Sequence, residues 1–436
     1  MTAPAVNRRG FIRTVAGGAL GGMMLYSFPN ESRAQRGATD EVVPSDDEQF
    51  WKGLRKEFLI PASETFCNTA TLGAMPRRVL DVVTSSMRET EETLAQWDYR
   101  PEHPDWFAGY RPFEDVRDPL ARLINCDVHE LALAQNATAS LNYVGQGIDL
   151  KPGDEIVQTD QEHIGAKSTW EQRARRHGAV LRNVAIEIPP NDPQRIIDDF
   201  DKVIGPRTRV LALPHQTSML GLILPVKEII AIARAKGHPK LFVVLDGAQS
   251  VGQINIDVKA LDCDAYGFSP HKWLLAPPGC GALYIRRSRQ EEIWTTLCSG
   301  EWANYEKGAY RFMQIGTGNR ALYDGLKVAA EFRLWLGQER VTRRIKALGD
   351  ALRDGLQKIP GVVIKSSIHP AMAAGMTTYS VPGMTGPELM DAFWEKKYRV
   401  RSMGPDVGVR HSLHIYNSMR DVERALDIVS ALVKRH

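Results

Sequence analysis

The sequence has few cysteines, almost no excess charge and no long hydrophobic run. Its five cysteines are scattered among 436 residues and no two form a Cys-x-x-Cys pair, which excludes a disulfide scaffold, a zinc ribbon and a thioredoxin-like site. No apolar run reaches the roughly 20 residues that a membrane-spanning helix needs. Hydrophobic residues at 43% and charged residues at 25% are ordinary for a globular protein. The composition predicts a soluble enzyme or binding protein, either cytosolic or exported, with no stable membrane insertion.

The first 34 residues have the composition of a targeting leader. A basic segment, Asn7-Arg-Arg-Gly-Phe-Ile-Arg-Thr14, precedes a glycine-rich, weakly hydrophobic run from Val15 to Phe28 and a small-x-small site at Ser32-Arg-Ala34. This order predicts a secretory signal peptide, and the paired arginines followed by x-Phe-Ile-Arg resemble a twin-arginine (Tat) signal. We expect export by the Tat machinery to the periplasm, or out of the cell where there is no outer membrane. The alternatives are a basic tail and an uncut anchor.

The leader also accounts for the small net charge of the chain. It holds four arginines and one glutamate, which leaves 51 basic and 51 acidic residues in the remainder. A mature chain without net charge lacks the attraction to phosphate backbones on which nucleic-acid binding depends. The sequence therefore predicts no nucleic-acid partner.

Between about residues 130 and 297, short β-rich runs alternate with amphipathic stretches. Near-continuous apolar strands that alternate with helices predict an α/β fold with a mostly parallel sheet covered on both faces. The expected strands are Leu131–Ala134, Ile156–Thr159, Val180–Val184, Val210–Leu213, Leu241–Leu245, Ala265–Phe268 and Ala282–Ile285. The expected helices are Ser140–Ile148, Ser168–His177, Pro193–Val203 and Pro225–Ala235.

Beyond Leu297 the pattern changes to longer helices and fewer strands, which predicts a smaller α+β domain. Its expected helices and strands are Ala321–Gly337, Glu339–Ile359, Val362–Lys365, Met376–Val381 and Asp421–Lys434. The predicted division is a signal peptide (1–34), an N-terminal segment that completes the small domain (41–75), a large α/β domain (76–297) and a C-terminal small domain (298–436).

Polar residues directly follow three of the expected strands, at the sheet edge where α/β proteins bind ligands. The three segments are Asp246-Gly-Ala-Gln249, Ser269-Pro-His-Lys272 and Pro214-His-Gln-Thr-Ser218. A carboxylate can meet a cationic ring nitrogen, and a lysine can form a Schiff base while serine and histidine hold a phosphate. These are the parts that a pyridoxal phosphate (PLP) enzyme needs. Taken singly, the aspartate also fits a helix cap and the lysine a solvated turn.

Two of these segments carry a specific resemblance. Asp246-Gly-Ala-Gln249 together with Phe268-Ser-Pro-His-Lys-Trp-Leu-Leu-Ala-Pro-Pro-Gly279 resembles the class V aminotransferase family, PLP enzymes of fold type I. The resemblance extends from about Phe66 to the C-terminus. It implies PLP as cofactor, bound by the large domain.

The resemblance also implies roles for residues around the cofactor. Lys272 would form the Schiff base and carry the proton at the substrate α-carbon, Asp246 would pair with the ring nitrogen, Gln249 would bond the phenolic oxygen, and His163 would stack on the ring. Three further residues would hold the phosphate near a helix N-terminus: Thr138, Ser269 and His271.

Four residues are implied at the edges of this site. Thr317 resembles the residue that reaches the phosphate of the partner subunit, which implies a homodimer. Arg410 would clamp the substrate α-carboxylate, and Asn68 is a further substrate-binding candidate. Ser218 stands where relatives often have asparagine near the phenolic oxygen, so its role is open.

The cysteines separate the branches of the family. Cysteine desulfurases carry a nucleophilic cysteine on a C-terminal loop, whereas the last cysteine here is Cys298 and none occurs from Ser299 to His436. This argues against a desulfurase or a selenocysteine lyase that uses such a thiol. The segments His215–Val226, Arg410–Asn417 and Phe66–Pro76 instead resemble the isopenicillin N epimerase-like subgroup.

With its leader, the chain is also similar to exported PLP enzymes that tailor peptide natural products, such as those of siderophore (pyoverdine) maturation. The aromatic segment from Trp97 to Arg111 is expected either to line a substrate entrance or to pack in the protein core.

We predict an exported PLP enzyme that acts at the α-carbon of an amino acid or amino-acid-containing product, by epimerase-like or peptide-tailoring chemistry. A C–S lyase or transaminase is the alternative, and a non-catalytic binding module the second alternative. Epimerisation needs a second acid/base besides Lys272, which the sequence does not identify.

Overall fold

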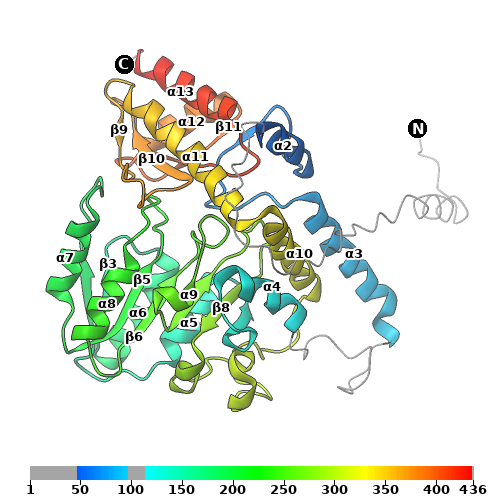
Figure 1. Cartoon of the computed structure of the whole chain (residues 1–436), viewed down its shortest axis with the longest axis vertical. Helices are drawn as coiled ribbons and strands as arrows, with labels where there is room; N and C mark the ends of the chain where they lie inside the picture. The colour runs from blue at the N-terminus through cyan, green and yellow to red at the C-terminus, as the bar shows by residue number, and fades with distance from the viewer. Residues whose placement is uncertain (1–46, 97–112, 435–436) are drawn as a thin grey trace, which may run out of the picture. The chain divides into compact units, whose positions relative to one another are not determined.

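The largest element of the structure, a computed structural model that describes residues 47–96 and 113–434, is a seven-stranded sheet (Figure 1). Its strand order is β2-β8-β7-β6-β5-β3-β4. The strands are β2 (Leu131–Ala134), β3 (Glu155–Thr159), β4 (Val180–Val184), β5 (Thr208–Pro214), β6 (Phe242–Asp246), β7 (Ala265–Phe268) and β8 (Gly281–Ile285). All pairs are parallel except those of β8 with β7 and β2. The predicted α/β class with a mostly parallel sheet is therefore confirmed. The leader and the segment from Trp97 to Arg111 lie outside the described residues.

Helices cover both faces of this sheet. Every residue of β3, β5, β6, β7 and β8 is buried, although successive side chains of a strand point to opposite faces. The covering helices are α5 (Ala137–Gly147), α6 (Ile164–His177), α7 (Pro193–Val203), α8 (Val226–Lys236) and the short α9 (Val258–Leu261). The bounds of α5, α6, α7 and α8 match the predicted helices to within a few residues, whereas α9 was not predicted.

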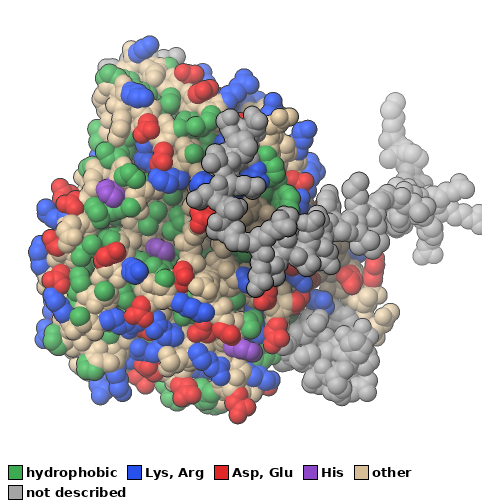
Figure 2. Space-filling model, viewed as in Figure 1, with side chains coloured by type: hydrophobic (Ala, Val, Ile, Leu, Met, Phe, Trp, Pro, Cys, Tyr) green, Lys and Arg blue, Asp and Glu red, His purple; other side chains and the backbone are tan. Residues whose placement is uncertain are grey.

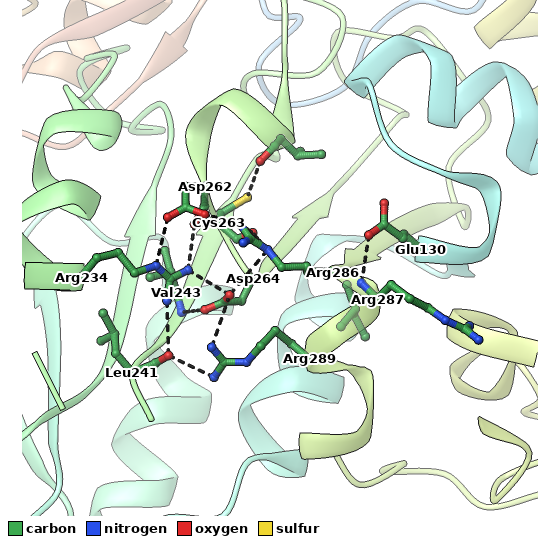
Figure 3. A network of polar contacts seen from close by, with 12 residues as sticks. Glu130, Arg234, Leu241, Val243, Asp262, Cys263, Asp264, Arg286, Arg287 and Arg289 are labelled. Carbon is green, nitrogen blue, oxygen red and sulfur yellow. Dashed lines mark hydrogen bonds and ion pairs between the residues drawn. The ribbon is translucent and has the colours of Figure 1, made fainter. Parts of the chain in front are cut away.

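The register of β6 and β7 is fixed at their N-terminal ends by Asp264 (Figure 3). Its carboxylate accepts a hydrogen bond from the backbone N–H of Val243 at 2.8 Å and from Arg234 at 2.9 Å. Arg286 and Arg289 lie 3.8 and 3.6 Å from Oδ1, the carboxylate oxygen that Arg234 also contacts. The Asp264 side chain is only 1% exposed. One backbone N–H and three guanidinium groups thus surround one buried carboxylate.

A second, four-stranded antiparallel sheet has the order β12-β13-β10-β9. Its strands are β9 (Val363–Ile364), β10 (Met376–Ser380), β12 (Arg401–Ser402) and β13 (Val409–Ser412), and its helices are α11 (Gln338–Gln357), α12 (Gly386–Glu395) and α13 (Met419–Val433). These elements share a hydrophobic cluster that includes Leu352, Leu389 and Val429. Near the start of the described chain, β1 (Thr65–Phe66) pairs in parallel with β11 (Tyr398–Arg399). The N-terminal segment therefore lies beside the C-terminal part of the chain.

The remaining helices lie outside the two sheets. They are α2 (Asp47–Leu54), α3 (Arg77–Thr93), α4 (Glu114–Ile124) and α10 (Arg320–Leu336), with 3-10 helices at Arg55–Glu57, Leu94–Gln96, Val128–Glu130, Arg287–Glu292 and Tyr305–Phe312. Among them, α10 packs against both α3 and α4. Although α10 follows residue 297, its Leu326 and Ala330 belong to the hydrophobic cluster of the seven-stranded sheet. The domain boundary at residue 297 stays a prediction.

The surface carries charges of both signs. On the face drawn in Figure 2, lysine and arginine side chains are interspersed with aspartate and glutamate. None of the helices within 47–96 and 113–434 is both long and apolar enough to cross a membrane.

Replacing Asp264 tests whether this carboxylate fixes the strand register. Asp264→Asn leaves three arginines without their shared buried charge, so we expect the free energy of unfolding to fall by about 3 kcal/mol. Asp262→Asn is the matched control, because Asp262 pairs with Arg234 and Arg286 but its side chain is 51% exposed; we expect it to cost about 1 kcal/mol or less. Urea unfolding measures both values, and equal losses would contradict the role of Asp264.

Candidate active site

Asp246 and Lys272 lie at the carboxyl edge of the seven-stranded sheet. Asp246 is the last residue of β6, where it pairs with Gly267 of β7, and Lys272 lies in the turn that follows β7. Burial raises the pKa of Asp246, while the backbone N–H of Ala248, at 2.8 Å, and the charges of Lys272 and His163 oppose that rise. The structure thus brings together the acid and the lysine that the sequence pattern paired.

Lys272 is prepared to act as a nucleophile. Its pKa is lowered to about 8, mainly by burial; the charge of Asp246 opposes this shift, and the charges of Arg410 and Arg401 add to it. An amine with this pKa is unprotonated far more often at neutral pH than an ordinary lysine, and the unprotonated amine is the form that attacks a carbonyl carbon.

His163 and Thr138 lie at the starts of two adjacent helices. The Nδ1 atom of His163 accepts a hydrogen bond from the N–H of Gly165 at 3.1 Å and caps α6. Thr138 is in the first turn of α5, and a Cβ at Gly165 would lie 2.4 Å from its hydroxyl oxygen, so only glycine permits this approach. Burial first, and then the charge of Lys272, lowers the pKa of His163, which keeps its ring neutral. Two helix starts with a hydroxyl between them fit a phosphate group.

Ser269 and His271 come from the loop that carries Lys272. The Ser269 hydroxyl accepts a hydrogen bond from the N–H of Ala137, at the start of α5, at 2.9 Å. The Nδ1 atom of His271 is buried without a hydrogen-bond partner, and burial lowers the pKa of this ring to about 4. Buried polar atoms are normally paired, so this orphaned nitrogen fits a site completed by a bound ligand.

Gln249 ties three segments together beneath the site. Its Oε1 atom accepts a hydrogen bond from the Trp273 indole at 2.8 Å, and its Nε2 atom donates to the Ala70 carbonyl at 3.0 Å. One amide N–H remains for a further acceptor. The hydrogen bond from Gln249 to the phenolic oxygen of the cofactor stays a prediction.

Arg410 belongs to a cationic pair. It lies on β13, is 2% exposed, and donates to Thr71 Oγ1 at 3.2 Å and to the Ser218 carbonyl. Arg401 stands directly opposite on β12 and donates to the same Thr71 oxygen at 3.0 Å. Thr71 in turn donates to Asn68 Oδ1 at 2.8 Å. Asn68 therefore positions Thr71, and Ser218 offers its backbone oxygen to Arg410.

Thr317 lies apart from this group. It is exposed in the loop before α10 and lines a separate cavity of about 410 Å³ with Gln135, Gly279 and Tyr323. Its contact with a partner subunit stays a prediction. The part of the chain that the structure describes contains no group of His, Cys, Asp and Glu side chains arranged for a metal ion.

Sequence reasoning missed Arg401, Thr71 and Glu162. Arg401 and Arg410 stand on either side of a Gly- and Pro-containing turn, Met403-Gly-Pro-Asp-Val-Gly408, which is a hairpin signal that would have paired them. The other two had no such signal, because Thr71 acts through arginines more than 300 residues away and Glu162 through its burial.

Glu162 is a half-buried acid next to His163. Burial raises its pKa to about 8, while hydrogen bonds from the Thr159 N–H at 3.2 Å and the Thr159 hydroxyl at 3.1 Å oppose the rise, and the charge of Asp246 adds to it. Near neutral pH the folded protein therefore holds Glu162 as a protonated, uncharged group next to His163.

This protonation predicts a pH-dependent stability difference. Glu162 keeps its proton to about pH 8 when folded, whereas the unfolded chain loses it near the ordinary value of 4.5, so the free energy of unfolding falls as pH rises between these values. Glu162→Gln lacks this loss, and its melting temperature relative to wild type should rise by about 2 °C or more from pH 5 to pH 8. Thermal unfolding followed by circular dichroism measures it, with the exposed Glu187→Gln as control. A difference that does not change with pH would contradict the buried protonated state.

The assembled residues fit pyridoxal phosphate. Asp246 is a buried carboxylate that has no lysine or arginine at ion-pair distance among the described residues, as a protonated ring nitrogen requires. Lys272 has a lowered pKa, the starts of α5 and α6 fit a phosphate, and His271 has a free buried nitrogen.

Comparisons with known proteins agree with this geometry. The sequence profile described as "Aminotransferase class-V" matches residues 82–425. An isopenicillin N epimerase of Streptomyces clavuligerus is 32% identical over 405 residues, which are 88% of this chain and 98% of that protein. A probable cysteine desulfurase of Pseudomonas putida is 28% identical over 387 residues, 84% of this chain and 92% of that protein.

Among solved structures, the cystine C–S lyase C-DES in complex with its product cysteine persulfide has a TM-score of 0.75 and 25% identity. The match covers 85% of this chain and 98% of that chain. A second structure of C-DES holds glycine covalently linked to its PLP cofactor, with a TM-score of 0.76. The chain therefore belongs to the aminotransferase class V family of PLP-dependent enzymes, with fold type I.

Proposed function

We propose that this PLP enzyme acts at the α-carbon of an amino acid, or of an amino-acid-containing natural product, by epimerase-like chemistry. The observation that carries the proposal is the grouping of Lys272, Asp246 and Arg410, whose charges act on one another across the ends of the two sheets. The similarity to isopenicillin N epimerase over 98% of that protein supports this branch.

Each residue has one task in this chemistry. Bound PLP supplies an electron-accepting ring that stabilises negative charge at the substrate α-carbon. Asp246 would hold the proton of the ring nitrogen, and Arg410 would bind the substrate carboxylate and so orient the α-proton toward Lys272. Lys272 would exchange that proton on its own face of the α-carbon, for which a pKa of about 8 is well matched to neutral pH. Inversion also needs a second acid/base that delivers a proton to the opposite face. His163, neutral at the start of α6, covers a face of the ring.

Three of the five thiols are unsuited to desulfuration, and the other two, Cys126 and Cys298, both precede the C-terminal loops. The connection between β12 and β13 is a hairpin over residues 403–408 without cysteine. Cys67, Cys263 and Cys280 are fully buried, and burial raises the pKa of each thiol. A buried thiol with a raised pKa is a poor nucleophile. A C–S lyase remains the second candidate, supported by the likeness to the cystine C–S lyase.

The proposal predicts exchange of the α-proton with solvent. Incubated in D₂O with the correct amino-acid substrate, the protein should incorporate deuterium at the α-carbon and accumulate the opposite stereoisomer, as followed by NMR. Lys272→Ala should slow the exchange about 10³-fold, whereas Lys227→Ala, an exposed lysine of α8, should not change it. Pyruvate formation from cystine without exchange products would favour the lyase. Exchange that survives Lys272→Ala would overturn the proposal.

We also propose export of this enzyme through the Tat pathway, and work on a peptide natural product outside the cytoplasm. The support is the leader with Arg8, Arg9 and Phe11. Replacing Arg8 and Arg9 together by lysine should keep the protein in the cytoplasm, as cell fractionation and immunoblotting measure. Arg33→Lys, a variant outside the arginine pair, is the control and should leave export intact. Unchanged export of the double variant would contradict the Tat proposal.

The same family membership leads us to propose a homodimer in which Thr317 meets the partner's cofactor site. Thr317 is exposed, as are Gly318 and Asn319, which supports an intermolecular role for this loop.

A further inference from the structure

We propose that Arg401 forms a second anion subsite beside Arg410, and that the substrate carries a second carboxylate next to its α-carboxylate. This inference rests on the proposed function for the role of Arg410 and narrows the substrate to acidic amino acids or products that contain one. It makes Arg401 a specificity-determining residue.

The hairpin of β12 and β13 places the two arginines side by side. Arg401 and Arg410 are directly opposed in the antiparallel register, and directly opposed residues project to the same face of a sheet. Both guanidinium groups donate to the single oxygen Thr71 Oγ1, at 3.0 and 3.2 Å. The two cations are therefore only a few ångströms apart.

Neither arginine has a counter-charge. Within the described residues no carboxylate lies at ion-pair distance from Arg401 or Arg410, and the hydroxyl that they share is neutral. Arg399, two residues before Arg401, shows the contrast: its guanidinium is held by both carboxylate oxygens of Glu64. The Nε atom of Arg410 is buried and without a partner. Two adjacent cations that share only a neutral hydroxyl favour binding of an anion.

The two cations differ in depth, which favours two carboxylates over one shared carboxylate. Arg410 is 2% exposed and fixed to the Ser218 carbonyl, whereas Arg401 is exposed. Both act on the charge states of Lys272 and His163, so both face the reacting centre. A carboxylate on Arg410 lies at the inner position, and Arg401 is left for a second anionic group at the outer position.

The cofactor does not account for the second cation. Its phosphate fits the starts of α5 and α6 with Thr138 and Ser269, and its ring nitrogen fits Asp246. An α-carboxylate then neutralises Arg410. The charge of Arg401 remains for the substrate, and because both guanidinium groups contact Thr71 Oγ1, a short four- or five-carbon diacid can offer one carboxylate to each.

Unreactive acids test the subsite without turnover. Isothermal titration of the PLP-loaded protein with glutarate, and with pentanoate as the matched monocarboxylate, measures the value of the second charge. We expect glutarate to bind about tenfold more tightly than pentanoate. Arg401→Gln should remove that preference and leave pentanoate binding unchanged, and Arg401→Lys should retain part of it. Arg410→Gln should weaken both ligands, and Arg420→Gln, an exposed arginine of α13, should change neither.

Two results would overturn the proposal. If wild type binds glutarate no more tightly than pentanoate, there is no second anion subsite. If Arg401→Gln weakens both acids equally, the two arginines clamp one carboxylate together. The proposed function is tested by a different measurement. If no amino acid shows α-proton exchange, the proposed function fails, but the preference for glutarate and its dependence on Arg401 can still be measured.

Discussion

The alignment of β6 with β7 is the constraint on which the site depends. Asp246 ends one strand and Lys272 follows the other, so a shift of one residue would separate the acid from the amine and turn their side chains to opposite faces. Asp264 fixes this alignment at the other end of the same strands through Val243 and three arginines. A buried carboxylate on the side of the sheet away from the reaction thus determines the geometry at the reacting edge.

Burial then adjusts the chemistry of the groups that the sheet brings together. It raises the pKa of Asp246, lowers that of Lys272 to about 8 and lowers that of His271 to about 4. The shifts of the acid and the amine both favour the uncharged forms. Burial of a charged side chain is unfavourable unless an opposite charge lies nearby. A ligand with a cationic ring nitrogen beside Asp246 and an anionic group beside Arg410 would supply that opposite charge to both side chains. The site is consequently complementary in charge to PLP, and the second arginine is the basis of the proposed preference for an acidic amino acid.

The sequence predicted the seven-stranded sheet well because its strands are continuous apolar runs that alternate with helices, and the ends of β6 and β7 carry the cofactor motif. The four-stranded sheet was less accessible: β12 has two residues and β13 four, too few for a periodic pattern. Thr71 was missed because its contacts are distant in sequence and Glu162 because its role comes from burial, whereas Arg401 could have been paired with Arg410 from the turn between them. Packing of α10 against the large sheet is likewise a tertiary property. The roles of Gln249 and Thr317 depend on the cofactor and a second subunit.

We propose that PLP is covalently attached to Lys272. Borohydride reduction of the purified PLP-loaded protein, followed by mass spectrometry of its peptides, tests this directly. We expect loss of the yellow absorbance on reduction and a pyridoxyl phosphate mass on the peptide that contains Lys272. An unmodified Lys272 at saturating PLP, or stoichiometric modification of a different lysine, would contradict it.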